Sequence, residues 1–223
     1  MTQLRLDLWR PVFETHSPFV QGPSNATARN RLANWADWHG GCLVLYGPEG
    51  SGKSHLARDW SKQTLAEFLN PMAPDLTRAA GRPVVIEDVD QGFDPESLFH
   101  LINLAGHEGA GLLLTARTPP VSWSTTLPDL VSRLRALQFV ELSPPDDLVL
   151  EGVLRSFFLA RGMNPAPEIY PYLVNRIDRS ILAARWIVER LDEVADGLDR
   201  PVTRALARQI LGDEPDQPDL LAE

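Results

Sequence analysis

Eight residues from Gly47 to Ser54 carry the most specific chemistry in the sequence, and they read GPEGSGKS. They fit the pattern G-x-x-x-x-G-K-[ST], in which successive backbone N–H groups surround phosphate oxygens. Gly50 and Gly52 permit backbone conformations that a Cβ atom would block. Lys53 is expected to contact the β- and γ-phosphates, and the hydroxyl of Ser54 is expected to bind Mg²⁺. The stretch therefore predicts a P-loop that binds a nucleoside di- or triphosphate.

Phosphate binding by this loop requires a strand before it and a helix after it, and the sequence predicts both. An apolar run at 42–46 reads as a buried parallel strand, and helix-compatible sequence follows from His55. A helix that begins near Gly52 points the positive end of its dipole at the phosphates. The alternative, a glycine-rich turn with an exposed lysine, does not require this order of strand, loop and helix. We expect nucleotide contacts from Pro48, Glu49, Gly50, Ser51, Gly52, Lys53, Ser54 and His55.

A second apolar run, at 83–86, ends in two adjacent acids, Glu87 and Asp88. A buried strand that delivers a carboxylate beside Mg²⁺ is the usual companion of a P-loop. We expect Asp88 to contact the nucleotide, and we expect Ser54, Asp88 and Glu87 to hold the metal. The usual order is aspartate first and a water-activating acid second, so the reversed order leaves hydrolysis by this chain open. A solvated acidic turn is the other interpretation of the pair.

Further residues have the chemistry to meet the phosphates of this nucleotide or of a neighbour. Thr115 ends a third apolar strand, at the sensor position of many ATPases, and Arg117 follows it; ordinary strand-end polarity is the alternative for both. Arg133 and Arg135 lie two residues apart on an expected helix and cannot share one face. At least one of them should project outward, as an arginine finger for a neighbouring site. For Arg133, an ion pair with Asp129 is the alternative.

Arg179 stands at the start of another expected helix, at 180–195. A cation in the first turn of a helix opposes the helix dipole, so an anionic ligand would compensate for its position. We therefore expect Arg179 to contact nucleotide phosphate. An ion pair with Asp178 or Asp192 is the alternative.

The composition is that of a globular, acidic protein. The 223 residues are 43% hydrophobic and 23% charged, and the net charge of -9 disfavours a broad DNA-binding surface. Cys42 is the single cysteine, which excludes an internal disulfide, and the five histidines lack metal-ligand spacing. No apolar run approaches the roughly 18 residues of a membrane span, and the N-terminus lacks a signal-peptide core. We expect a cytoplasmic protein that does not bind membranes.

Strands and helices alternate up to Pro144, which implies a parallel sheet covered by helices. A helix at 25–39, with Ser24 as its N-cap, is expected before the first strand. After Pro145 the periodicity is helical only, over 146–161, 167–176, 180–195 and 203–211. The expected domains are an N-terminal peptide (1–10), an α/β nucleotide-binding domain (11–144), a small helical domain (145–212) and a disordered acidic tail (213–223).

The first residues, from Gln3 to Leu8, alternate apolar and polar side chains. A first β-strand is one interpretation of this alternation. The segment precedes a proline-containing stretch at 11–23 and has no nearby partner strand. An exposed peptide that docks its leucines into an apolar pocket of another protein is therefore the other interpretation.

These features together resemble the AAA+ family and, within it, the DnaA/Hda group of replication initiators and their regulators. The resemblance extends over about residues 3–211. It rests on the box near the adenine (19–25), the P-loop, the strand with its acids (84–88), the box that contains Ser-Arg-Leu (127–134), the start of the lid helix and the peptide pattern Q-L-x-L-x-L (3–8).

The resemblance implies an α/β AAA+ P-loop NTPase core, with a parallel sheet flanked by helices, followed by a small all-α lid. It implies ADP or ATP with Mg²⁺ as the cofactors. Arg133 matches the arginine finger, which leaves Arg135 outside the pattern, and Arg179 matches the sensor arginine of the lid. The residues that match the peptide for binding the DNA polymerase sliding clamp are Gln3, Leu4, Leu6 and Leu8.

The function implied is negative regulation of replication initiation. The chain would bind the clamp and stimulate hydrolysis of the ATP on DnaA, with Arg133 supplied in trans, weak or no turnover of its own, and a homo-oligomer allowed. Initiators carry a helix-turn-helix domain after the lid, so we expect no direct sequence-specific DNA binding here. The short segment at 54–82 suggests that a strand and a helix of the core are trimmed. A stand-alone P-loop ATPase or kinase and a helicase-loader-like DNA-binding ATPase are the alternatives.

Overall fold

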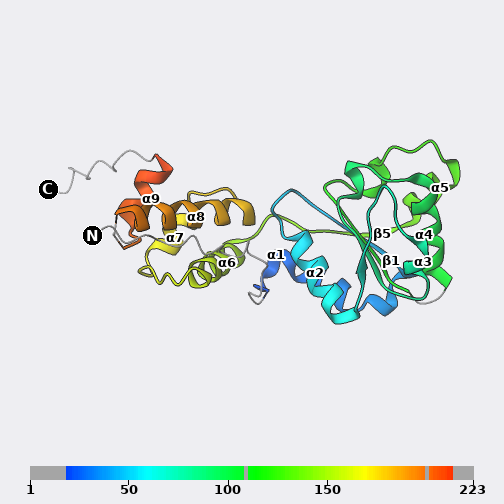
Figure 1. The fold of residues 1–223 in the computed structure, drawn as a ribbon, viewed down its shortest axis with the longest axis horizontal. Helices are drawn as coiled ribbons and strands as arrows, with labels where there is room; N and C mark the ends of the chain where they lie inside the picture. Colours follow the sequence, from blue (N-terminus) through cyan, green and yellow to red (C-terminus); the bar gives the residue numbers. More distant parts are fainter. Residues whose placement is uncertain (1–18, 108–109, 199–200, 213–223) are drawn as a thin grey trace, which may run out of the picture.

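The computed structural model describes residues 19–107, 110–198 and 201–212. The expected clamp-binding peptide (1–10) and the expected acidic tail (213–223) therefore lie outside the described residues. Figure 1 shows two bodies, a sheet with its covering helices and a group of helices beside it. We refer to the first, which includes β1–β5 and α1–α5, as the sheet part, and to the second, α6–α9, as the helical part.

The sheet has five parallel strands in the order β2-β3-β4-β1-β5. Four of these strands were predicted from the apolar runs, whereas the two-residue β2 was not. Its presence means that the short segment before β3 keeps a reduced strand. The strands are β1 (Cys42–Tyr46), β2 (Glu67–Phe68), β3 (Val84–Ile86), β4 (Leu112–Ala116) and β5 (Gln138–Glu141).

Helices cover both faces of the sheet, as the alternating sequence predicts (Figure 1). Successive side chains of β1 point to opposite faces. Val44 belongs to the core cluster on the side of α4, whereas Leu43 and Leu45 belong to the cluster on the side of α1 and α2. The helices are α1 (Pro23–Ala33), α2 (Lys53–Thr64), α3 (Leu76–Ala79), α4 (Pro95–His107) and α5 (Pro128–Ala136).

The prediction for α1 is wrong at both ends. The N-cap is Gly22 rather than Ser24, and the helix ends at Ala33, six residues before the expected end. Ser24 lies inside the first turn because it pairs with Asp146: its N–H donates to Asp146 Oδ2 (2.8 Å), and the Asp146 N–H donates to Ser24 Oγ (3.2 Å). Beyond α1 the chain turns tightly through Gly41, whose φ is +69° and where a Cβ would lie 2.2 Å from a backbone oxygen of α4.

The helical part has a core of its own. Asp146 caps its first helix by accepting the Val149 N–H at 2.9 Å, and Leu154, Phe158 and Leu173 are fully buried between the helices. All four helices occur where the sequence predicts them, with bounds that differ by up to three residues. They are α6 (Asp147–Ala160), α7 (Ile169–Val174), α8 (Ile181–Leu198) and α9 (Arg204–Leu211). No helix within the described ranges is both long and apolar enough to cross a membrane.

Contacts between the described residues of the two parts include three that lie near the carboxyl edge of the sheet. Asp146 joins them through its bonds with Ser24. Val20 packs against α6 so closely that a Cβ at Gly152 would lie 2.5 Å from it. The Ile181 N–H at the start of α8 donates to the Gly50 carbonyl in the P-loop at 2.8 Å. These contacts fix how the helical part lies against the loop.

Candidate nucleotide-binding site

The P-loop connects β1 to α2 and takes conformations that favour glycine. Gly47, Gly50 and Gly52 have φ values of +156°, +74° and +106°. A Cβ at Gly47 would lie 2.2 Å from the Leu142 carbonyl, and one at Gly50 would lie 2.0 Å from Ser180 Oγ. The loop is therefore packed between the end of β5 and the start of α8, with no room for side chains at these two positions.

Lys53 is held by its own loop. Its side chain is buried, and Nζ donates to the carbonyls of Gly47 (2.8 Å) and Pro48 (2.9 Å). An ammonium group has three donors, so one remains for a ligand. Burial lowers the pKa of Lys53, while the Asp88 carboxylate opposes this shift. A phosphate at the loop would add a second anionic partner and favour the charged form.

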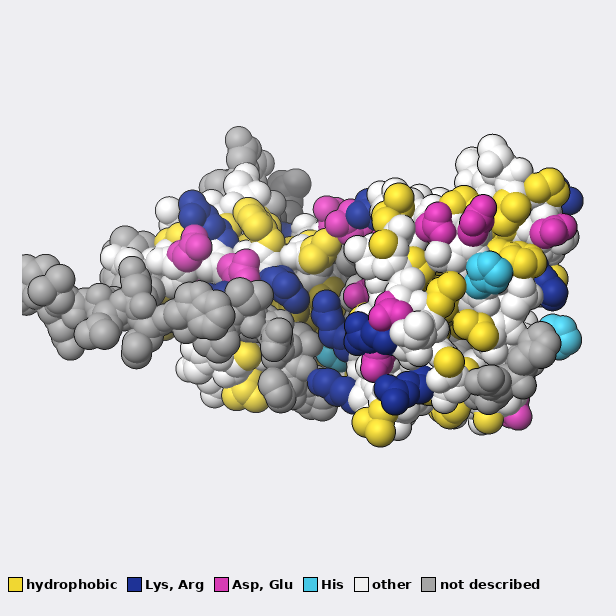
Figure 2. All heavy atoms as spheres, turned by 45° about the vertical axis from the view of Figure 1, so that its right-hand side comes forward, with side chains coloured by type: hydrophobic (Ala, Val, Ile, Leu, Met, Phe, Trp, Pro, Cys, Tyr) yellow, Lys and Arg dark blue, Asp and Glu magenta, His cyan; other side chains and the backbone are white. Residues whose placement is uncertain are grey.

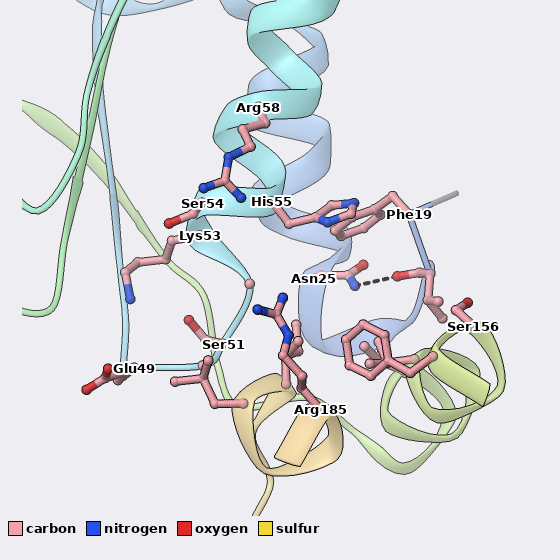
Figure 3. Close-up of a pocket in the computed structure, with 18 of the residues that line it drawn as sticks. Phe19, Asn25, Glu49, Ser51, Lys53, Ser54, His55, Arg58, Ser156 and Arg185 are labelled. Carbon is pink, nitrogen blue, oxygen red and sulfur yellow. Dashed lines mark hydrogen bonds between the residues drawn. The ribbon is translucent and has the colours of Figure 1, made fainter. Parts of the chain in front are cut away.

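A cavity of about 320 Å³ lies between the loop and the helical part (Figure 3). This volume is in the range of small-molecule sites. One end is polar and formed by 49–54, and the other is apolar. The lining of the apolar end includes Phe19, Val20, Val149, Val153 and Phe157. A polar cradle joined to an apolar slot suits a ligand with phosphates at one end and a planar ring at the other.

The apolar end is shaped by Asn25 and His55. Asn25 is buried; its Nδ2 donates to the Val20 carbonyl at 2.9 Å, and its Oδ1 accepts the Gly22 N–H at 3.2 Å. His55 lies against Phe19 with ring centroids 5.3 Å apart. Burial lowers the pKa of His55, against the opposing charge of Asp59, so the ring is neutral near pH 7. His55 therefore adds no charge to the wall of this end.

The two acids after β3 differ in where they lie. Asp88 lines the cavity, and its field acts on Lys53, whereas Glu87 is not part of the lining. Asp88 has φ +52°, a left-handed conformation that is uncommon outside glycine. Its N–H donates to Thr115 Oγ1 at 3.0 Å, and Thr115 is fully buried. Thr115 thus holds the backbone that aims Asp88 at the loop.

The metal ligands expected from the sequence are brought together only in part. Ser54 and Asp88 both line the cavity. Glu87 has a buried Oε1 that lacks a hydrogen-bond partner in the part of the chain that the structure describes. Within that part, no group of three or more His, Cys, Asp or Glu side chains is arranged to hold a metal by itself. Mg²⁺ at this site would therefore depend on phosphate oxygens as well as on the protein.

Several cations face the cavity. Arg117 lines it and pairs with Glu49 at 3.0 Å. Arg58 and Arg185 also line it, and neither was predicted from the sequence. Figure 2 shows Lys and Arg side chains gathered, with acidic ones among them, where the helical part meets the sheet part. Helical spacing could have revealed Arg58, because it is four residues after Ser54 and so lies on the same face of α2.

Arg179 is not brought to the cavity. The helix begins at Ile181, and Ser180 caps it by accepting the Leu182 N–H at 3.1 Å, so Arg179 lies before the helix. Its guanidinium pairs with Asp147 at 2.6 Å and donates to the Pro145 carbonyl at 3.3 Å. The expectation of a first-turn cation is therefore wrong, and a nucleotide contact by Arg179 stays a prediction.

Arg133 lies away from the chain's own cavity. It is exposed on α5, and it makes no hydrogen bond or ion pair with another residue of the described ranges, so the pair with Asp129 does not form. Burial raises the pKa of the Cys42 thiol to about 12, and the charge of Arg133 opposes that shift. Cys42 begins β1, whereas the P-loop follows its end, so Arg133 is near the opposite edge of the sheet. Arg135 is also exposed.

A parallel sheet in the order β2-β3-β4-β1-β5, a P-loop after β1 and a helical part against that loop define an AAA+ P-loop fold. Domain III of Thermotoga maritima DnaA matches with a TM-score of 0.71 and 20% identity, over 87% of this chain and 94% of that one. AMPPCP-bound DnaA from Aquifex aeolicus matches with a TM-score of 0.60 and 18% identity, over 82% of this chain and 66% of that one. These likenesses establish the fold.

The sequence comparison shows which AAA+ protein the chain is similar to. The chromosomal replication initiator protein DnaA of Caulobacter vibrioides is 28% identical over 228 residues, which cover 86% of this chain and 46% of the initiator. The chain thus spans about half the length of the curated relative that it matches. No protein-family model matches it. The chain therefore has an AAA+ P-loop fold and a sequence similar to that of DnaA.

Proposed function

We propose that the chain binds an adenine nucleotide, ADP or ATP, together with Mg²⁺. The observation that carries this proposal is the cavity, with its P-loop at one end and the neutral slot of Phe19 and His55 at the other. The slot can take a purine ring while Lys53 keeps one donor for the phosphates. A DnaA of similar fold was solved with AMPPCP.

Ser54 and Asp88 would contact Mg²⁺, which would neutralise phosphate charge there. The hydroxyl and the carboxylate are oxygen ligands of the kind that Mg²⁺ prefers. Glu87, which does not line the cavity, would act on the ion indirectly at most. Titration calorimetry with ADP, ATP, GDP and GTP, each with and without Mg²⁺, tests the site. Equal affinity for guanine and adenine nucleotides would contradict the assignment of the slot to adenine.

The nucleotide would act as a conformational switch. The start of α8 bonds to the P-loop through the Ile181 N–H and the Gly50 carbonyl, so a ligand that shifts the loop also shifts the helix. ADP would favour the arrangement that acts on a partner. Hydrogen exchange of α8 with and without ADP measures this coupling, and an unchanged exchange rate in the first turns of the helix would exclude it.

The partner would be ATP-bound DnaA, and the chain would stimulate hydrolysis of that ATP. Support comes from Arg133, which is exposed, without a partner among the described residues, and remote from the chain's own cavity. An arginine supplied in trans stabilises transition-state charge in other P-loop proteins. The direct test is the rate of ATP hydrolysis on DnaA in a mixture with sliding clamp, DNA and this chain. Absence of stimulation would overturn the proposal.

Attachment to the DNA-loaded sliding clamp would come from the peptide Gln3–Leu8, and this part of the proposal rests on the sequence alone. A pull-down on immobilised clamp, with and without residues 1–8, tests it. Leu4→Ala and Leu6→Ala should weaken capture strongly, whereas Arg5→Ala should not, because only the leucines are expected to enter apolar pockets. Full capture without residues 1–8 would exclude the tether.

A stand-alone ATPase is the second candidate. Asp88 is close enough to act on the pKa of Lys53, and Thr115 fixes its backbone, so the carboxylate would be placed to hold Mg²⁺ for hydrolysis. Sustained ATP turnover by the isolated chain, lost in Asp88→Asn, would favour this candidate. Turnover that appears only when DnaA is present would favour the regulator.

A further inference from the structure

One face of α8 looks into the cavity. Ile181 begins the helix at the P-loop, and its side chain would lie 3.1 Å from a Cβ at Gly52. Leu182 and Arg185 also line the cavity. Arg185 is four residues after Ile181, so it lies on the same face of α8, one turn further along the cavity wall.

Arg185 reaches the middle of the cavity. Its Cζ lies 5.7 Å from the centre of the Phe157 ring, which is itself part of the lining. Figure 3 shows the guanidinium pointing from α8 into the space between Ser51 of the P-loop and Asn25 of α1. Ser51 is at the polar end and Asn25 at the apolar end, so the guanidinium lies where the phosphate and ring portions of a nucleotide would join.

Arg179, the other arginine near the start of α8, is already committed elsewhere. It pairs with Asp147 at 2.6 Å and with the Pro145 carbonyl at 3.3 Å, more than half of its side chain is exposed to solvent, and it does not line the cavity. A move into the cavity would break both contacts. Arg185 already lies in the wall of the cavity.

We propose that Arg185, and not Arg179, is the cation by which the helical part binds the nucleotide, through its α- or β-phosphate. The assignment rests on the proposed nucleotide site. A guanidinium presents a planar fork of donors that can hold phosphate oxygens in a bidentate contact, which the ammonium of a lysine cannot reproduce. The Phe157 ring lies beside this fork, with its centre 5.7 Å from Cζ. Arg185 therefore links phosphate binding to the position of α8.

The test compares four variants by their dissociation constants for ADP, AMP and adenosine, measured by calorimetry. Arg185→Ala should weaken ADP binding about 10- to 100-fold, the range expected for a charged hydrogen bond. Arg185→Lys should restore part of the loss, and Arg179→Ala should stay within about 2-fold of wild type. Adenosine affinity should be unchanged in Arg185→Ala, because the lost contact is to phosphate.

Lys53→Ala, the fourth variant, separates the two levels of inference. If it leaves ADP binding intact, the P-loop site itself is wrong. If it abolishes binding while Arg185→Ala has no effect, or Arg179→Ala has the larger effect, only the Arg185 assignment is wrong. An equal loss for adenosine and ADP in Arg185→Ala would mean that the side chain only supports the Phe157 wall. Thermal unfolding without nucleotide controls for misfolding of each variant.

Discussion

The two edges of the sheet hold their cations in opposite ways. At the carboxyl edge, Lys53 is buried and bonded to the carbonyls of Gly47 and Pro48. Near the amino edge, Arg133 is exposed and has no hydrogen-bond or ion-pair partner within the described ranges. A buried, pre-positioned cation serves a ligand that comes to it, whereas an exposed arginine can enter the site of another molecule. Lys53 therefore suits ligand binding by this chain, whereas Arg133 suits action on a partner.

The carboxyl edge is also the edge to which the helical part is tied. The bonds of Gly50 to Ile181 and of Ser24 to Asp146 both lie there. A change in the P-loop can therefore be transmitted to α8, while Arg133 is positioned by α5 alone, through the burial of Leu130 and Leu134. We expect substitutions at the two edges to affect different measurements.

The largest expected effect belongs to Arg133→Ala. Loss of an arginine finger lowers the stimulated rate by about 10³-fold or more, so stimulation of hydrolysis on ATP-bound DnaA should vanish. ADP binding by the chain itself should be unchanged. Arg135→Ala is the matched control, because it removes an equally exposed arginine from the same helix. Equal losses of the stimulated rate in both variants would indicate a diffuse electrostatic effect of the helix. Arg133 would then have no specific role as a finger.

Lys53→Ala should lower the affinity for ADP about 100-fold, because a buried charge-assisted contact to phosphate is removed. Lys62→Ala, an exposed position on the same helix α2, controls for net charge and should change the affinity less than 2-fold. Both constants come from calorimetry at fixed salt. An unaltered affinity in Lys53→Ala would contradict the role of Lys53 as the phosphate-binding cation at the carboxyl edge of the sheet.

The strands and the P-loop could be predicted from the sequence because they depend on local patterns of residues. Apolar runs located β1, β3, β4 and β5, and the P-loop pattern located the cradle, because strand periodicity and glycine spacing act within a few residues. Arg185 was missed because its role depends on how the helical part packs against the loop. Arg179 was expected to face the ligand, but the nearby Asp147 holds its charge outside the cavity. The bond from Asp146 likewise moved the cap of α1 away from Ser24.

Gly50→Ala tests the tie between the P-loop and α8. The added Cβ would lie 2.0 Å from Ser180 Oγ, on a backbone with φ +74°. We expect a loss of about 2–4 kcal/mol in the free energy of unfolding, from a left-handed alanine and the displaced helix. Gly40→Ala is the control, since its φ is +63° with nothing within 4 Å, and should cost only about 1–2 kcal/mol. Denaturant unfolding measures both losses. Equal losses of free energy in the two variants would mean that Ser180 moves away from the added Cβ at no cost.

The smallest effect concerns Asp146, which ties α6 to α1. Burial alone would raise its pKa, but the hydrogen bonds from Ser24 and Val149 lower the pKa below its ordinary value. Because the folded-state pKa is the lower one, the stabilisation is complete above about pH 4 and is lost as the pH falls through the folded-state value. Asp146→Ala should therefore cost about 1–2 kcal/mol at pH 7, and this difference from wild type should shrink at pH 3. Urea unfolding of both proteins at the two pH values measures it. A difference that stays constant down to pH 3 would mean that the carboxylate is not what holds the two helices together.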